Sequence, residues 1–109
     1  MADFVKVATD AEILPGTAVR VDVAGTPVAL TRTADGELFA IKDVCSHADV
    51  ALSEGEVEDC TIECWLHGSQ FDLRTGKPLT LPAIVAVPVY DVRLVDGAIE
   101  IATEPKGTE

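Results

Sequence analysis

The chain of 109 residues has few basic side chains, with 8 lysines and arginines against 19 aspartates and glutamates. A nucleic-acid-binding protein needs a basic surface to contact phosphates, so this composition argues against nucleic acid as a partner. The acidic excess is typical either of a surface that keeps the protein in solution or of a face that docks a basic protein.

Long hydrophobic runs are also missing. No apolar stretch approaches the roughly 20 residues that a membrane-spanning helix needs, although 48% of the residues are hydrophobic. The first residues lack the basic region and apolar stretch that mark a signal peptide. We therefore expect a cytoplasmic protein without a membrane partner.

Aromatic residues make up only 5% of the chain, while valine, isoleucine and alanine are common. Apolar residues alternate with polar ones in short segments bounded by glycine-containing turns, which predicts an all-β protein. We expect strands at residues 17–23, 28–32, 38–42, 61–63 and 70–72, and a final hairpin through 90–94 and 99–101. The capping-box spacing from Thr9 to Glu12 predicts one helical turn, which Pro15 and Gly16 end.

Only three cysteines and two histidines are present. Two of the cysteines fall into two short motifs, which leaves Cys60 without a mate. In a cytoplasmic protein we expect no disulfide. Because Cys60 alternates with Thr61 as a strand residue would, we expect it to be a small buried residue and not a metal ligand.

The two motifs are Cys45-Ser46-His47 and Cys64-Trp65-Leu66-His67-Gly68, with sixteen residues between His47 and Cys64. Two thiolates and two imidazoles suit a two-iron cluster with unlike ends, and they also suit one tetrahedral zinc ion. In common zinc knuckles two cysteines lie a few residues apart, whereas each motif here mixes its ligand types. This arrangement favours the iron cluster, with a structural zinc module as the alternative.

The spacing C-x-H, then about 15–17 residues, then C-x-x-H resembles the Rieske [2Fe–2S] signature. The resemblance implies one [2Fe–2S] cluster, with Cys45 and Cys64 on one iron and His47 and His67 on the other. It covers nearly the whole chain, so we expect a single Rieske (ISP-like) domain over residues 1–109. Its antiparallel β-sandwich base would carry an inserted cluster-binding subdomain at about residues 43–83.

The resemblance also implies roles for residues around the cluster. Gly68 would let the loop backbone approach it, and Ser69 could donate a hydrogen bond to it. Pro82, in Leu81-Pro82-Ala83, would lie in a loop that covers it, unless this segment is an ordinary turn. Trp65 would shield the cluster or form part of a docking face, or it would have a simple packing role.

One branch of the family, in respiratory and photosynthetic cytochrome complexes, has two further cysteines that form a disulfide. Here the equivalent positions hold Val50 and Leu66, which cannot form that bridge but could pack together. A tyrosine hydroxyl of that branch is replaced by Phe71, which cannot donate a hydrogen bond. Fewer donors to the cluster sulfurs stabilise the reduced form less, so we expect a midpoint potential on the order of −150 mV.

These features resemble the ferredoxins of bacterial aromatic-ring-hydroxylating oxygenase systems. Such a ferredoxin is a one-electron carrier, and its partners are a flavin-dependent reductase and a terminal non-heme iron oxygenase. A catalytic subunit would need a second iron site with two histidines and a carboxylate, but both histidines here already belong to the motifs. We therefore expect a monomeric electron-transfer component and not an enzyme. The alternatives are an accessory protein of iron–sulfur cluster assembly and a nitrite-reductase-like small subunit.

Overall fold

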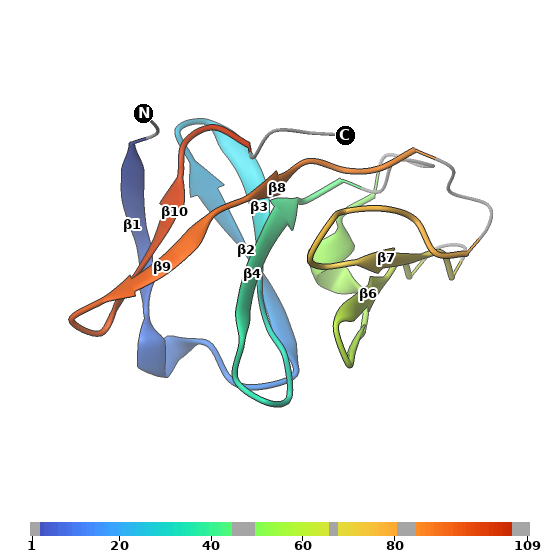
Figure 1. Cartoon of the computed structure of the whole chain (residues 1–109), viewed down its shortest axis with the longest axis horizontal. Helices are drawn as coiled ribbons and strands as arrows, with labels where there is room; N and C mark the ends of the chain where they lie inside the picture. The colour runs from blue at the N-terminus through green and yellow to red at the C-terminus, as the bar shows by residue number, and fades with distance from the viewer. Residues whose placement is uncertain (1–2, 45–49, 66–67, 81–84, 106–109) are drawn as a thin grey trace.

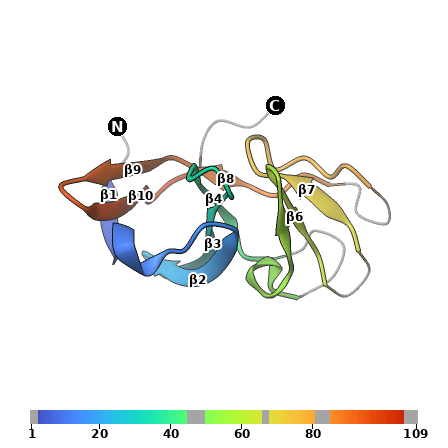
Figure 2. The same cartoon turned by 90° about the horizontal axis from the view of Figure 1, so that it is seen from below.

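The chain forms three small antiparallel β-sheets that follow one another along the longest axis of the molecule (Figure 1). This computed structural model describes residues 3–44, 50–65, 68–80 and 85–105. The molecule measures 39 × 28 × 21 Å. In the view turned by 90°, the middle sheet again lies between the two others (Figure 2).

The first sheet has the order β1-β10-β9, formed by Phe4–Thr9, Ala98–Ala102 and Val92–Val95. The middle sheet has the order β2-β3-β4-β8, formed by Thr17–Val23, Thr26–Arg32, Leu38–Lys42 and Val89–Tyr90. The third has the order β5-β6-β7, formed by Val57–Glu58, Thr61–Glu63 and Gln70–Asp72. Two three-residue 3-10 turns, η1 (Asp10–Glu12) and η2 (Leu52–Glu54), are the only helical segments in these ranges, so the described residues hold no helix that could cross a membrane.

Two hairpin turns of the base use left-handed backbone conformations at consecutive residues. Asp96 and Gly97 have φ angles of 51° and 80°, and Ala24 and Gly25 have 52° and 88°. Two consecutive positive φ angles are the requirement of a type I′ turn, whose twist matches that of the strands it joins. These turns set the β9–β10 and β2–β3 registers.

Two hydrophobic cores lie on opposite faces of the middle sheet. Alternate residues of β3 point to opposite sides, so Val28 and Leu30 enter one core while Ala29 enters the other. The base core fills the space against the first sheet and includes Ile99 and Ile101. The second core joins the middle sheet to the third, and its buried members include Ile41, Leu52, Ile62, Cys64, Phe71 and Leu73.

The third sheet is an insertion between two hydrogen-bonded strands of the base. Strand β4 ends at Lys42 and β8 begins at Val89, and the two pair through Ala40 with Tyr90 and Ile41 with Val89. The amide of Lys42 also donates to the carbonyl of Pro88 at 2.9 Å. The chain therefore leaves and re-enters the base at one place, and the described residues between these strands form the lobe on the right of Figure 1.

The predicted all-β architecture is confirmed, including strands 17–23 and 38–42 at their expected bounds. The capping box is present, because the Thr9 amide donates to Glu12 Oε1 at 2.7 Å, and this bond lowers the pKa of Glu12. Strands β1 and β5 were not predicted. The expected single strand over 90–94 is divided into β8 of the middle sheet, which ends at Tyr90, and β9 of the first sheet, which begins at Val92. Leu94 is exposed on β9, an edge strand.

Candidate metal centre

Cys64 follows directly after β6 and is fully buried. It belongs to the second core, where its neighbours include Leu52, Ile62 and Phe71. The apolar surroundings exclude water from one side of the thiol. A thiol in this position is held by packing on a rigid sheet, which is what a cluster ligand needs.

The backbone closes the loop that begins at Cys64. The amide of Cys64 donates to the carbonyl of Ser69 at 2.7 Å, and the amide of Gly68 donates to the carbonyl of Cys64 at 2.8 Å. Just below, Glu63 pairs with Gln70 as the last pair of the β6–β7 ladder. These bonds fix both ends of the second motif on the same end of the sheet.

Gly68 has a φ of 78°, a conformation that other residues adopt only with strain. The nearest atom to a Cβ placed there would be Glu63 Oε2 at 3.7 Å, so space is available. The left-handed backbone conformation, and not a lack of space for a side chain, therefore explains why this position is a glycine. Ser69, which follows it, is fully buried.

Trp65 lies next to Cys64 but points into solvent, with 51% of its surface exposed. A simple packing role would bury the indole, so this finding favours a role at the surface. Of the predicted site residues, the structure thus places Cys64, Trp65, Gly68 and Ser69 on one loop. The remaining four, Cys45, His47, His67 and Pro82, lie outside the described residues, as does Leu66.

The residues present fit an iron–sulfur cluster. In the described part of the second motif, a buried thiol, two backbone bonds and a left-handed glycine hold Cys64 in place at one end of the third sheet. Elsewhere in the described ranges, no three His, Cys, Asp or Glu residues gather as a metal site would require. Thiolates and imidazoles are the ligands that a mixed two-iron centre uses.

Two of the positions at which this chain differs from the cytochrome-complex branch lie within the described residues. Phe71 is fully buried in the second core and has no hydroxyl to donate. Val50 is partly buried and packs against the same core. Its expected contact with Leu66 involves a residue outside the described ranges and stays a prediction.

Cys60 differs from our expectation. It lies in the turn between β5 and β6, not in a strand, and it is only partly buried. Asp59, with a φ of 52°, and Cys60 form the two-residue turn, so the strand that we expected to include Cys60 begins one residue later, at Thr61. Partial burial raises the pKa of the Cys60 thiol, and the neighbouring Arg74 opposes this shift.

An acidic groove runs between β2 and the third sheet. It has a volume of 670 Å³, and its charged lining residues are Glu56, Glu58 and Glu63. Glu63 immediately precedes Cys64, so the groove reaches the base of the second motif. The sequence composition predicted an acidic excess but not its concentration here.

Sequence reasoning missed three residues that make close contacts beside the motifs. Asp43 precedes the first motif and binds Ser53, and Gly55 packs against the backbone of Glu63. An aspartate after a strand, a serine and a glycine occur in any loop region. No signal in the sequence distinguishes them from solvated turn residues.

Comparison with known proteins gives a consistent result. Residues 3–91 match the Rieske [2Fe-2S] domain family. The chain is 50% identical over 80 residues to the "Anthranilate 1,2-dioxygenase ferredoxin subunit" of Burkholderia cepacia, covering 72% of this chain and 73% of that protein. The chain therefore belongs to the Rieske [2Fe-2S] domain family.

Solved structures share the fold. The ferredoxin in the "Complex of reduced oxygenase and oxidized ferredoxin in carbazole 1,9a- dioxygenase" is 35% identical, with a TM-score of 0.88 over 95% of this chain and 96% of that one. A protein from Mycobacterium tuberculosis, described as a putative NADH-dependent nitrite reductase small subunit, is 28% identical. Its TM-score is 0.86 over 94% of this chain and 96% of that one.

Proposed function

We propose that this protein carries single electrons from a flavin-dependent reductase to the terminal oxygenase of an aromatic-ring dioxygenase system. The observation that carries the proposal is the ligand pattern itself, placed on a fold that matches a ferredoxin seen in complex with its oxygenase. The relative from Burkholderia cepacia is likewise a ferredoxin subunit of a dioxygenase. The chain supplies an electron carrier and not the catalytic site.

Four residues would hold the cluster. Cys45 and Cys64 would bind one iron, and His47 and His67 the other, within a cluster-binding subdomain at about residues 43–83. When bound, a Rieske [2Fe–2S] cluster accepts and releases one electron at a higher potential than an all-cysteine cluster. The closed loop from Cys64 to Ser69 supports this assignment by presenting its residues from a rigid sheet end.

Exposed apolar side chains on the same lobe as this loop supply a docking surface. Trp65, Leu79 and Val85 are 51%, 53% and 59% exposed. Leu79 lies beside the second motif, because its amide donates to the carbonyl of Gln70 at 2.6 Å. Segment 85–87 runs close to residue 76, since the Val87 amide donates to the Gly76 carbonyl at 2.9 Å. We call Trp65, Leu79 and Val85 the apolar rim.

The charge of the chain fits basic partners. The formal net charge is −11, and the acidic groove adjoins the second motif. Complementary charge accelerates encounter, while an apolar contact gives the docked complex its short-range fit. A carrier that must meet two partners in turn benefits from this combination, and we propose that it acts as a monomer. With two of three cysteines assigned to iron, a reducing compartment such as the cytoplasm suits the protein.

The likeness to a nitrite reductase small subunit supports a second candidate, an accessory subunit of another enzyme. The presence of all four ligands in this chain favours the electron carrier. An electron-transfer assay with a reductase and a terminal oxygenase distinguishes the two functions. A carrier would pass electrons between them as a separate protein. An accessory subunit would instead stay bound to its enzyme.

The cofactor is tested by EPR of the dithionite-reduced protein, with iron and acid-labile sulfide counted on the same sample. A rhombic signal whose average g lies below that of an all-cysteine cluster would support mixed ligation. Zinc in place of iron, with no signal, would contradict the proposal. Voltammetry then tests the expected midpoint potential, on the order of −150 mV.

The carrier role is tested by mixing the reduced protein with a terminal oxygenase of an aromatic-ring dioxygenase system. Stopped-flow absorbance should show one electron leaving per cluster. A protein with an intact cluster that delivers no electrons to any such oxygenase would point to the accessory role.

A further inference from the structure

Asp43 is a fully buried carboxylate at the end of β4, two residues before Cys45. Its Oδ1 accepts a hydrogen bond from the amide of Ser53 at 2.7 Å, and its Oδ2 accepts one from the Ser53 hydroxyl at 2.7 Å. Arg20 Nε lies 3.2 Å from Oδ2. Both oxygens of the carboxylate are therefore occupied.

These bonds join the two ends of the first motif's loop. Asp43 lies before Cys45 and His47, and Ser53 lies after them in η2. The loop end at Asp43 is also attached to the base, because its amide donates to the carbonyl of Pro27 at 3.0 Å. The carboxylate thus connects η2 to the middle sheet across the segment that carries two proposed ligands.

A second contact extends this connection to the other motif. Gly55, directly after η2, lies so close to β6 that a Cβ on it would be 1.6 Å from the carbonyl oxygen of Glu63. The amide of Glu63 donates to the carbonyl of Glu56 at 2.8 Å. Since Cys64 is the next residue, the turn that Asp43 holds is packed against the start of the second motif.

We propose that Asp43 is a positioning residue for the cluster, acting through Ser53 to set the first ligand loop against the second. The proposal rests on the proposed ligand assignment. In this proposal, the Asp43 carboxylate affects the geometry of the ligands, and this role is distinct from any contribution to overall stability. Asp43 itself binds no iron.

The cost of burying Asp43 supports a specific role. A buried ion pair often gives no more stability than apolar residues of the same volume would. Arg20 compensates only part of the charge, because 56% of its side chain is exposed. The carboxylate nevertheless accepts two hydrogen bonds from a single serine, one from its amide and one from its hydroxyl. The bonds to Ser53, and not the charge, are the feature that an apolar side chain cannot supply.

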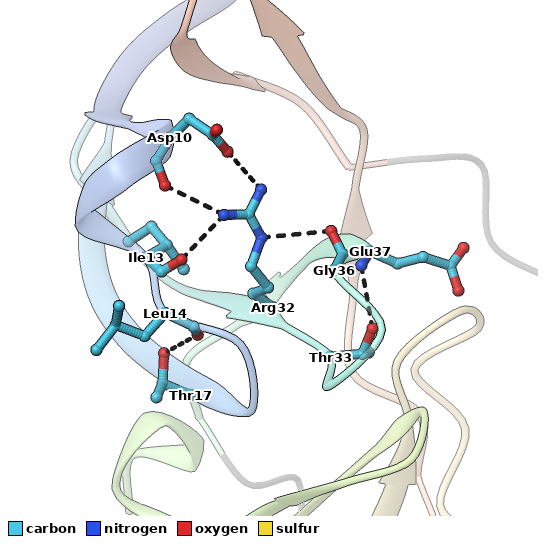
Figure 3. Close-up of polar contacts among 8 residues, drawn as sticks. All are labelled: Asp10, Ile13, Leu14, Thr17, Arg32, Thr33, Gly36 and Glu37. Carbon is cyan, nitrogen blue, oxygen red and sulfur yellow. Dashed lines mark hydrogen bonds and ion pairs between the residues drawn. The ribbon is translucent and has the colours of Figure 1, made fainter.

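The chain contains a matched control in the base. Arg32 donates to the carbonyls of Asp10 and Ile13 at 3.1 and 3.0 Å, and to Asp10 Oδ1 at 2.5 Å (Figure 3). Asp10 is thus also a carboxylate that ties a 3-10 turn to the middle sheet. It lies on η1, beside the first sheet, whereas β6 and β7, which flank the second motif in sequence, lie on the other side of the molecule (Figure 1).

The experiment compares D43A, D43N and D10A in the cluster-loaded protein. Cluster loss to an iron chelator is followed by absorbance, and thermal unfolding is measured on the same samples. We expect D43A to lose its cluster about 10-fold faster or more, the usual effect of removing a partner behind a metal ligand. D43N should restore retention, because an asparagine keeps an oxygen for the Ser53 amide and an amide donor for its hydroxyl. D10A should unfold earlier yet keep its cluster at the wild-type rate.

Each result decides the proposal. Cluster loss from D43A at the wild-type rate would overturn it, as would equal loss from D10A at a comparable unfolding temperature. Loss from D43N as fast as from D43A would also overturn it, since charge and not bond geometry would then matter. If D43A fails to fold, S53A replaces it: it removes one of the two bonds and should give an intermediate rate, and a wild-type rate there overturns the proposal. A wild-type protein that never binds iron would instead refute the proposed function.

Discussion

Gly55 lies against Glu63 with no room for a side chain, because a Cβ would come within 1.6 Å of the Glu63 carbonyl oxygen. The φ of Gly55 is −89°, so any residue can adopt its backbone conformation. Crowding alone therefore requires a glycine at this position. The contact brings the end of the first motif's loop to the start of the second.

Substitution of Gly55 by alanine should destabilise the protein by about 3 kcal/mol, the upper end of the cost of overpacking, because the obstacle is backbone and cannot rotate away. Chemical unfolding measures this change. Glu54, exposed on the same turn, is the control, and E54A should change stability by less than about 0.5 kcal/mol. A G55A protein as stable as E54A would show that the turn moves freely relative to β6.

Gly68 should be needed for a different reason. Its φ of 78° makes alanine strained by about 1–2 kcal/mol, the ordinary cost of the left-handed conformation. Gly97, with a φ of 80° and open space around it, is the matched control in the β9–β10 turn. We expect G68A and G97A to lose similar stability, while G68A alone alters the EPR signal and speeds cluster loss. An unchanged EPR signal in G68A would separate this loop from the cluster.

Two buried threonines should respond in opposite ways to valine. Thr31 is fully buried, and its hydroxyl has no hydrogen-bond partner among the residues that the structure describes. Valine has the same shape without the unsatisfied group, so T31V should stabilise the protein by about 1 kcal/mol. Thermal and urea unfolding measure the difference, and a destabilised T31V would indicate a partner for the hydroxyl.

The control for T31V is T33V. The Thr33 hydroxyl donates to Asp35, a bond that lowers the pKa of that carboxyl, and it accepts from the amide of Glu37 at 3.1 Å. Loss of the Thr33 hydroxyl should destabilise the protein at the β3–β4 turn by about 1 kcal/mol or more.

Much of this fold could be predicted because local chemistry sets it. The Asp96–Gly97 turn fixes its hairpin register by sequence alone, and alternation located β2 and β4. Strand β1 was missed because its partner β10 lies at the other end of the chain and no residue of β1 is fully buried. Its pattern is visible only when Phe4 is paired with Ala102.

The proposed ligands could be predicted from the sequence, but the residues that support them could not. Cysteine and histidine at fixed spacing are rare, so the motifs were recognisable. Asp43 contacts Ser53 and Arg20, which lie ten residues after it and twenty-three before it, and no spacing rule links such residues. Only the folded chain shows that this common residue type is buried at the end of β4, just before the first motif.

The Cys60 thiol should titrate above its ordinary range. Burial raises its pKa, and the nearby Arg74 lowers it by a smaller amount. Alkylation of the cluster-loaded protein, measured against pH, should therefore have a midpoint above about 8.5, the value of a free thiol. C60A should not be labelled, and R74Q should move the midpoint higher. A midpoint at or below the free value would contradict the burial.

The same shift makes a prediction for stability. Because the folded pKa of Cys60 is raised, its contribution is fully present below the unfolded pKa and is lost as pH rises towards the folded value. The stability of C60A should therefore fall less than that of the wild type between neutral pH and pH values above about 8.5. An equal fall in both proteins would exclude Cys60 as the source.

Leu79 in the apolar rim should contribute to docking, while Leu94 should not. The two leucines are similarly exposed, at 53% and 49%, but Leu79 lies beside the second motif and Leu94 on β9 of the first sheet (Figure 1). L79A should raise the concentration of this protein that half-saturates a terminal oxygenase by about fivefold, the effect of losing about 1 kcal/mol of binding. L94A should leave it unchanged, and both variants should keep the wild-type midpoint potential. Equal effects of the two substitutions would place the docking surface elsewhere, and a changed potential in L79A would mean that the substitution had disturbed the cluster itself.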